Sequence, residues 1–124
     1  MRIEALRKCI VARWPFNEAR YPRIALLQGE ERMLYMAKHI QEHLSHECGQ
    51  LARVLELVDH AKDLERALDE RHVNTQFVPI IRDLLVGTLR LADALGVSQE
   101  RLDDALDSYL EGTVIPVRQK PGPS

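Results

Sequence analysis

Apolar residues recur at helical spacing over most of this chain. The first run, in residues 3–13, predicts a short helix that Pro15 ends; its apolar residues are Ile3, Leu6, Ile10 and Val11. A longer run from Glu30 to about His60 repeats every three or four residues: Met33, Ala37, Ile40, Leu44, Cys48, Leu51, Leu55 and Val58. This run predicts one long amphipathic helix or two nearly continuous ones. Residues 61–71 either extend it or form a separate polar helix.

A more uniformly apolar helix follows. It should begin near Gln76, because Asn74 or Thr75 can cap it. Pro79 is tolerated only in a first turn, and Gly96 is suited to a position just after the helix ends. Its apolar side chains cover most of the circumference, which is typical of a central helix covered on several sides.

Ser98 can cap a last helix that runs to about Leu110 and ends at Gly112. Residues 114–124 hold three prolines and little to bury, so we expect an extended, mobile tail. No strand-like alternation accompanies the helical pattern. The fold class predicted is all-α, a bundle of four to five helices in one domain spanning residues 1–113.

Composition excludes several classes of function. The chain has 124 residues, of which 45% are hydrophobic and 29% are charged, with a formal net charge of -2. Its basic residues are spread along the chain, so a DNA or RNA duplex is not an expected partner. No apolar run is long enough to span a membrane. The two cysteines, Cys9 and Cys48, lie in separate predicted helices, and the N-terminus lacks the apolar run of a signal peptide, which indicates a reducing, cytoplasmic location. Cys48 is expected to be a buried, inert thiol, and Cys9 has no sequence-local base to activate it.

Residues 14–29 are the least regular part of the chain before the tail. They hold Pro15 and Pro22 together with three aromatic residues: Trp14, Phe16 and Tyr21. The segment is either a lid or docking arm, or a loop packed on the core by its aromatic side chains.

Two carboxylates stand out because nothing within their own helices neutralises them. Glu47 lies about 60° from the centre of the long apolar stripe, and its neighbours three and four positions away include no lysine or arginine. Asp83 is in the same situation within the most apolar helix. Each is therefore a candidate metal ligand, although Asp83 also suits an early helical turn, where the helix dipole favours an acid.

Side chains able to bind a metal form a ridge along the long helix: His39, His43, Glu47 and Gln50. Imidazole and carboxylate groups four residues apart can share one zinc ion. Histidines at the wet edge of an amphipathic helix are also ordinary surface residues, so the ridge leaves both interpretations open.

Two segments resemble the MazG-like family of all-α nucleoside triphosphate pyrophosphohydrolases. Residues 44–52, Leu-Ser-His-Glu-Cys-Gly-Gln-Leu-Ala, are similar to that family's Glu-Val-Gly-Glu-Leu segment. Asp83-Leu84-Leu85, continuing to Leu95-Gly96-Val97, is similar to its Gly-Asp-Val-Leu helix and the Leu-Gly-Ile turn that follows. The resemblance lies within residues 30–110, and the order of helices agrees with it.

The resemblance implies hydrolysis of a nucleoside triphosphate to a monophosphate and pyrophosphate, assisted by Mg²⁺ or Mn²⁺. The family uses an ExxE and an ExxD motif, whose carboxylates are hard oxygen ligands for such ions. Glu47 matches the first glutamate and Asp83 the final aspartate, whereas Gln50 and Ile80 replace the other two. The implied site is one ion held by Glu47, Gln50 and Asp83, with His43 as a possible further ligand.

An alternative follows from the missing carboxylates. The chain can instead be a non-catalytic helical module of the same ancestry that binds a nucleotide or a partner. Either form is expected to self-associate, because the helix from Gln76 to Leu95 presents more apolar surface than one small chain can cover. The resemblance implies a homodimer or homotetramer. Neither the nucleotide nor the persistence of catalysis follows from the sequence.

Overall fold

The computed structural model describes residues 2–112, and in this range the chain contains helices and loops but no strand. The predicted all-α class is therefore confirmed. Four helices of eleven residues or more carry the fold: α1 (Ile3–Arg13), α2 (Gly29–Asp59), α5 (Val78–Ala94) and α6 (Gln99–Leu110). Shorter segments join them: η1 (Pro22–Leu26), α3 (Leu64–Ala67), α4 (Glu70–His72) and η2 (Val73–Phe77). The predicted tail, residues 114–124, lies outside the described residues.

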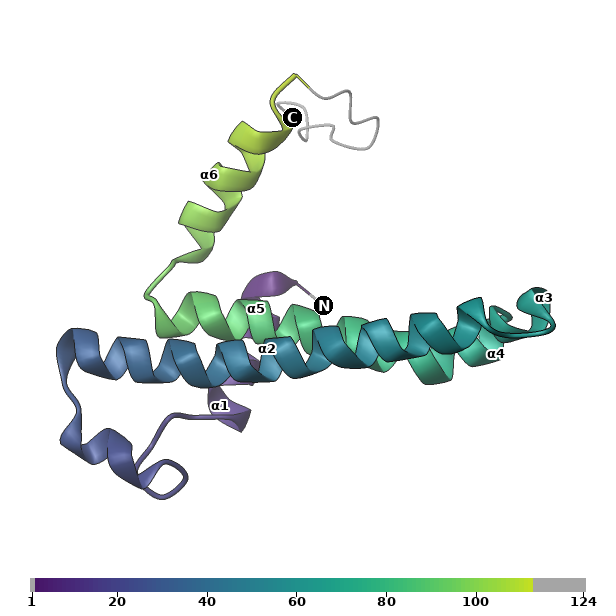
Figure 1. The fold of residues 1–124 in the computed structure, drawn as a ribbon. Coiled ribbons are helices and arrows are strands. Elements are labelled where there is room, and N and C mark those ends of the chain that lie inside the picture. Colours follow the sequence, from purple (N-terminus) through teal and green to yellow (C-terminus); the bar gives the residue numbers. More distant parts are fainter. Residues whose placement is uncertain (1, 113–124) are drawn as a thin grey trace.

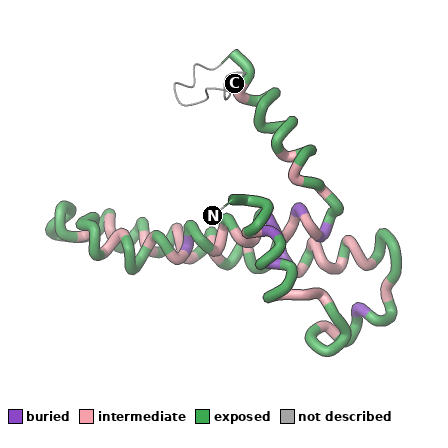
Figure 2. The backbone as a smooth tube through the Cα atoms, turned by 180° about the vertical axis from the view of Figure 1, so that it is seen from behind, coloured by how far each residue is buried: buried purple, intermediate pink, exposed green. Residues whose placement is uncertain are grey.

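α2 and α5 lie side by side as an antiparallel hairpin, which α1 crosses, while α6 leads away from it (Figure 1). Fully buried residues are few and gather where α1 meets the hairpin (Figure 2). Ile10 of α1, Ile24 of η1 and Ile40 of α2 are each at most 1% exposed. The fully buried core therefore lies toward one end of the long α2–α5 hairpin, and the end near α3 and α4 has few buried side chains.

The inner side of α2 follows a seven-residue repeat. Its buried and half-buried positions alternate by four and three residues: Met33, Ala37, Ile40, Leu44, Glu47, Leu51, Val54 and Val58. Cys48 and Leu55, which the sequence placed on this side, are exposed instead, and Cys9 is exposed as well. The predicted stripe was wrong at these positions because Leu55 and Val54 are about 100° apart, and packing on α5 selects Val54.

α5 and the last residue of η2 match this repeat, with Phe77, Ile80, Leu84, Gly87, Leu91 and Ala94 on the inner side. A Cβ atom at Gly87 would lie 2.6 Å from Leu44 Cδ2 and 3.3 Å from Leu44 Cγ. Any larger residue would require Leu44 to shift. This close contact lies one turn from the positions that carry Glu47 and Asp83.

The predicted start of the α5 helix was wrong. Asp69 caps the helical segment, because its side chain accepts a hydrogen bond from the backbone N–H of His72, 2.9 Å away. Thr75 lies within η2 and donates its hydroxyl to the carbonyl of Arg71. η2 is a π-helical segment in which the N–H of Val78 reaches the carbonyl of Val73, five residues back. This wider turn accommodates Pro79 in the interior of a continuous helix.

Arg7 joins α1 to the end of α5 and to the start of α6. Its side chain is buried, donates to Asp93 Oδ1 at 2.7 Å and to the carbonyl of Val97, and reaches Gln99 Oε1 at 3.2 Å. The α6 boundary is as predicted, because Ser98 accepts from the N–H of Arg101 and Gly96 adopts φ +69°. The buried guanidinium thus fixes the corner from which α6 leaves.

The matched substitutions Gly87→Ala and Gly49→Ala test the close approach of α2 and α5. Gly49 lies in α2 with open space around its Cα, so alanine there should raise the free energy of unfolding by ~0.5–1 kcal/mol. Alanine at Gly87 should lower it, because Leu44 must move. Urea unfolding of both variants checks this, and an equal gain in both would contradict the tight packing.

Candidate functional site

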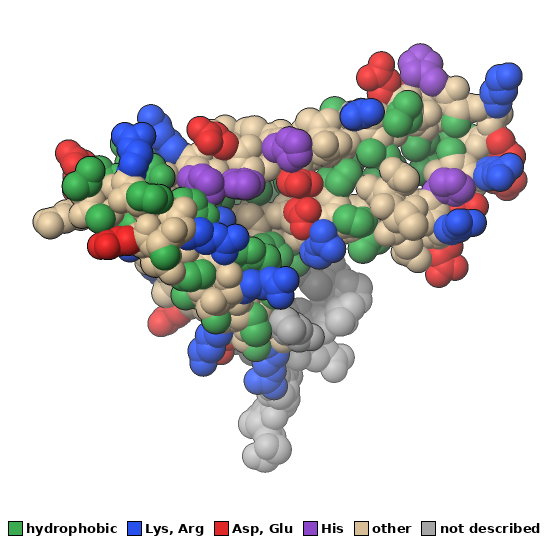
Figure 3. Space-filling model, turned by 90° about the horizontal axis from the view of Figure 1, so that it is seen from below, with side chains coloured by type: hydrophobic (Ala, Val, Ile, Leu, Met, Phe, Trp, Pro, Cys, Tyr) green, Lys and Arg blue, Asp and Glu red, His purple; other side chains and the backbone are tan. Residues whose placement is uncertain are grey.

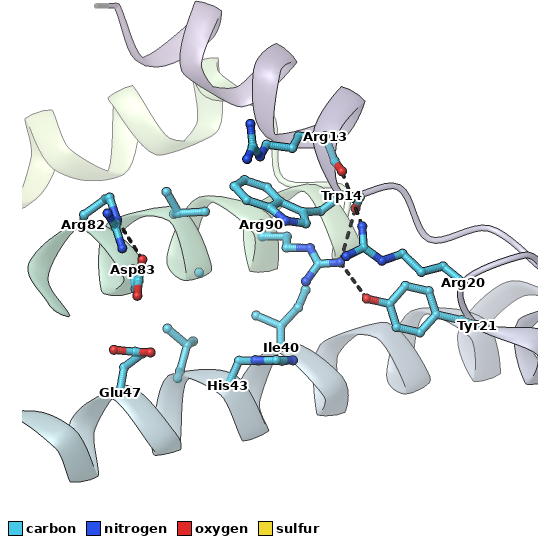
Figure 4. Close-up of a pocket in the computed structure, with 13 residues that line it drawn as sticks. Arg13, Trp14, Arg20, Tyr21, Ile40, His43, Glu47, Arg82, Asp83 and Arg90 are labelled. Carbon is cyan, nitrogen blue, oxygen red and sulfur yellow. Dashed lines mark hydrogen bonds and ion pairs between the residues drawn. The ribbon is translucent and has the colours of Figure 1, made fainter. Parts of the chain in front are cut away.

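A cavity of about 660 Å³ opens where α2, α5 and the end of α1 meet the loop that follows α1. Its lining is rich in charge: four arginines, two carboxylates and His43 (Figure 4). Trp14, Tyr21 and the inner residues of the hairpin complete it. Acidic, basic and histidine side chains also gather along the face of the molecule seen in Figure 3. This cavity combines the features of a site for a charged small molecule.

Glu47 and Asp83 form the acidic end of the cavity. They come from α2 and α5, and Figure 4 shows the two carboxylates turned toward each other across the hairpin. Glu47 takes a position of the α2 repeat that is otherwise apolar or small, and it is half-buried there. The structure thus brings together the two acids that the sequence singled out 36 residues apart (83 minus 47).

Asp83 has a partner that helical spacing did not indicate. Arg82 Nε donates to Asp83 Oδ1 at 2.9 Å, although neighbours in sequence do not usually face each other on a helix. This bond, followed by the charges of Asp83 and then Glu47, raises the pKa of Arg82 above its ordinary value. The Asp83 side chain is 40% exposed, so it remains accessible from the cavity.

The remaining two predicted ligands lie differently. His43 lines the cavity one turn before Glu47. Gln50 does not line it, and its amide nitrogen lies 3.5 Å from His46 Nε2. Within residues 2–112, no three histidine, cysteine or acidic side chains are grouped as metal ligands, so the His39, His43, Glu47 and Gln50 ridge does not assemble a zinc site.

Two facing carboxylates still suit one hard cation. Mg²⁺ is commonly bound through one or two carboxylates, with water and substrate phosphates completing its shell. Glu47 and Asp83 provide that number of oxygen ligands at one end of a cavity with room for a phosphate chain. The donor set fits one Mg²⁺ or Mn²⁺ ion and is too small for two.

The opposite end of the cavity is basic and aromatic, and its arginines were not predicted from the sequence. Arg13, Arg20 and Arg90 line it together with Trp14 and Tyr21. Arg90 packs over the Phe16 ring at 4.4 Å, and its Nη2 donates to the carbonyl of Trp14 and to Tyr21 Oη. The aromatic segment is therefore a packed loop, as one of the two sequence interpretations had it, and it also walls the cavity.

Tyr21, His39 and His43 form a short polar chain beside this loop. Tyr21 Oη lies 3.3 Å from His39 Nε2, which lies 3.1 Å from His43 Nε2. Since Arg90 donates to Tyr21 Oη, the tyrosine hydroxyl is free to donate to His39. Burial, and then the charges of His43 and Arg90, lower the pKa of His39 below 6.5. A neutral His39 is thus part of the loop's packing.

Comparison of the chain with protein-family models, with curated proteins and with solved structures finds no match. Within the described part of the chain, no helix is both long enough and apolar enough to cross a bilayer.

His39 gives the fold a dependence on pH. Because its pKa is lowered in the folded chain, the unfolded chain binds the proton first as the pH falls. Its contribution to stability is complete above about pH 6.5 and is lost as the pH falls through the lower, folded-state pKa. The thermal midpoint should therefore be lower at pH 5.5 than at pH 7.5.

This decrease in the thermal midpoint should be smaller in His39→Gln, because glutamine does not take up a proton. His46→Gln is the matched control, because His46 is exposed on the same helix. Calorimetric melting of the three proteins across this pH range provides the comparison, and equal slopes in all three would contradict the role given to His39.

Proposed function

We propose that this chain binds a nucleoside triphosphate with one Mg²⁺ or Mn²⁺ ion and hydrolyses it to a monophosphate and pyrophosphate, as the MazG-like enzymes that it resembles do. One observation carries the proposal. Glu47 and Asp83, from separate helices, line the same cavity as four arginines. Carboxylates for a cation and guanidinium groups for phosphate are the two requirements of a phosphate-ester hydrolase.

Each group would have a distinct role. Glu47 and Asp83 would hold the ion, which offsets negative charge on the phosphate oxygens when bound. The arginines would orient the phosphate chain, and His43 is placed to hold the attacking water by a hydrogen bond. Water would add to the α-phosphorus as its bond to the oxygen that bridges to the β-phosphorus breaks; pyrophosphate would leave with that oxygen, and the proton given up by the water would pass to solvent. Gln50 does not line the cavity and would have no role in this reaction.

Release of pyrophosphate from a panel of canonical and modified nucleoside triphosphates, with Mg²⁺ or Mn²⁺, tests the proposal. Glu47→Ala and Asp83→Ala should each reduce turnover to the uncatalysed background, because each removes one of two carboxylate ligands. Glu56→Ala is the matched control, since Glu56 belongs to a second Glu-x-x-Asp string on the exposed side of α2. Retained turnover in either cavity variant would sink the assignment.

A second candidate is favoured by the ion pair between Arg82 and Asp83. One oxygen of Asp83 already accepts from Arg82, and two carboxylates offset half the charge that four would. On this basis, the cavity would bind the nucleotide without cleaving it. Calorimetry that detects nucleotide binding by a chain that releases no pyrophosphate would select this candidate over hydrolysis.

Self-association is the further part of the proposal. Among the described residues, seven hydrophobic side chains are buried, whereas fourteen large ones are exposed. So much exposed apolar surface is typical of a chain that has a partner. A second copy of the chain would supply the helices that complete a MazG-like bundle, as a homodimer or homotetramer.

The surface for that copy lies on the outer side of α5. Val78, Ile81 and Leu85 follow helical spacing there and are 46%, 58% and 49% exposed. The sequence predicted that this helix would be covered on several sides, and a second copy is the cover we propose.

Light scattering of the eluted protein measures the association. The wild-type chain should have twice or four times the monomer mass of 14.2 kDa, whereas Ile81→Lys should lower the mass toward the monomer because it places a charge in the interface. Leu26→Lys is the control, since Leu26 is 84% exposed on η1 and away from α5. A monomeric wild-type protein would argue against the interface.

A further inference from the structure

Two arginines of the cavity are held side by side by consecutive backbone carbonyls. Arg20 Nη1 lies 3.4 Å from the carbonyl oxygen of Arg13, and Arg90 Nη2 lies 3.2 Å from that of Trp14. These carbonyls belong to the end of α1 and the residue after it, which have no helical partners to accept from. The chain thus gathers two guanidinium groups at one point although like charges repel.

Within the described part of the chain, no carboxylate forms an ion pair with either arginine. Among the described residues, the ion pairs join Arg7 to Asp93, His72 to Asp69 and Arg82 to Asp83, and none includes Arg13, Arg20 or Arg90. The cavity's own acids, Glu47 and Asp83, lie at its other end (Figure 4). Among residues 2–112, the guanidinium groups at this end therefore have no ion-pair partner.

Arg90 also has an unused donor. Its Nε is buried and has no hydrogen-bond partner, while its Nη2 is bound to Trp14 and Tyr21. Because this nitrogen is buried, an anion in the cavity would reach Arg90 through its other terminal nitrogen, Nη1. Arg13, whose guanidinium lies 5.3 Å from the centre of the Trp14 ring, adds a third positive charge on the same wall.

From these observations we propose that Arg20 and Arg90, with Arg13 beside them, form an anion site that binds a diphosphate group directly and without a metal ion. Guanidinium forks match the spacing of phosphate oxygens, and several positive charges favour a polyanion over a single phosphate. The site goes beyond the proposed hydrolysis, because it needs neither metal nor turnover. Its assignment to the pyrophosphate part of a nucleotide rests on the proposed function.

Calorimetry of the full chain with inorganic pyrophosphate in excess EDTA tests the site. Saturable binding is expected at low ionic strength, weaker binding in added salt, and weaker binding of orthophosphate. Arg20→Ala should raise the pyrophosphate Kd by about tenfold, because it removes one charge-assisted donor. Arg20 is exposed, so this variant should melt at the wild-type temperature.

Arg53→Ala is the matched control. It removes one positive charge from the exposed side of α2, outside the cavity, and should leave the Kd within about twofold. Arg90→Lys keeps the charge but loses the fork, and it should also weaken binding. Equal effects of Arg20→Ala and Arg53→Ala, or no binding of millimolar pyrophosphate, would overturn the site.

The test separates this site from the proposed hydrolysis. Glu47→Ala and Asp83→Ala should retain metal-free pyrophosphate binding even where they release no pyrophosphate from a nucleotide. If the wild-type chain binds pyrophosphate but hydrolyses no nucleotide, the anion site is supported and the proposed hydrolysis is wrong. If it hydrolyses a nucleotide but does not bind pyrophosphate without metal, the hydrolysis is supported and the anion site is wrong.

Discussion

The two long helices meet at Gly87, where the absence of a side chain makes room for Leu44. Leu44 fills the space that a Cβ would occupy, so α2 and α5 pack against each other in one register. In that register, Glu47 lies three residues beyond Leu44 and Asp83 four residues before Gly87, one turn from the contact on each helix. The close approach therefore determines that the two acids face each other, and with them the acidic end of the cavity.

The basic end depends on a different part of the chain. Arg90 of α5 holds the loop after α1 through the carbonyl of Trp14, the hydroxyl of Tyr21 and the face of Phe16. The same arginine lines the cavity. The loop therefore packs through the same side chain that forms the basic end of the cavity. A loop that came loose would also separate Arg20 from Arg90.

Local sequence signals were sufficient for the helices and for several of their ends. Ser98 and Gly96 act through their immediate neighbours, so their roles could be predicted without knowledge of the fold. The side of α2 that faces inward could not, because Cys48 and Glu47 differ by one helical step and only α5 decides between them. The seven-residue repeat through Val54 contains the signal, and it would have marked Glu47 as a charged residue in an otherwise uncharged seam. The grouping of Arg13, Arg20 and Arg90 could not be predicted from the sequence, because these residues come from α1, the following loop and α5.

The π-helical segment before Pro79 affects which insertions and deletions the hairpin can tolerate. A π turn behaves as an α-helix into which one residue has been inserted, and removing that residue would rotate the parts on either side by about 100° relative to each other. The tip of the hairpin, around α3 and α4, is joined to the Asp83 half of α5 through this turn. Length variation at the tip can be absorbed there as a change of winding, so the tip can diverge in sequence while the seam around Gly87 keeps its phase.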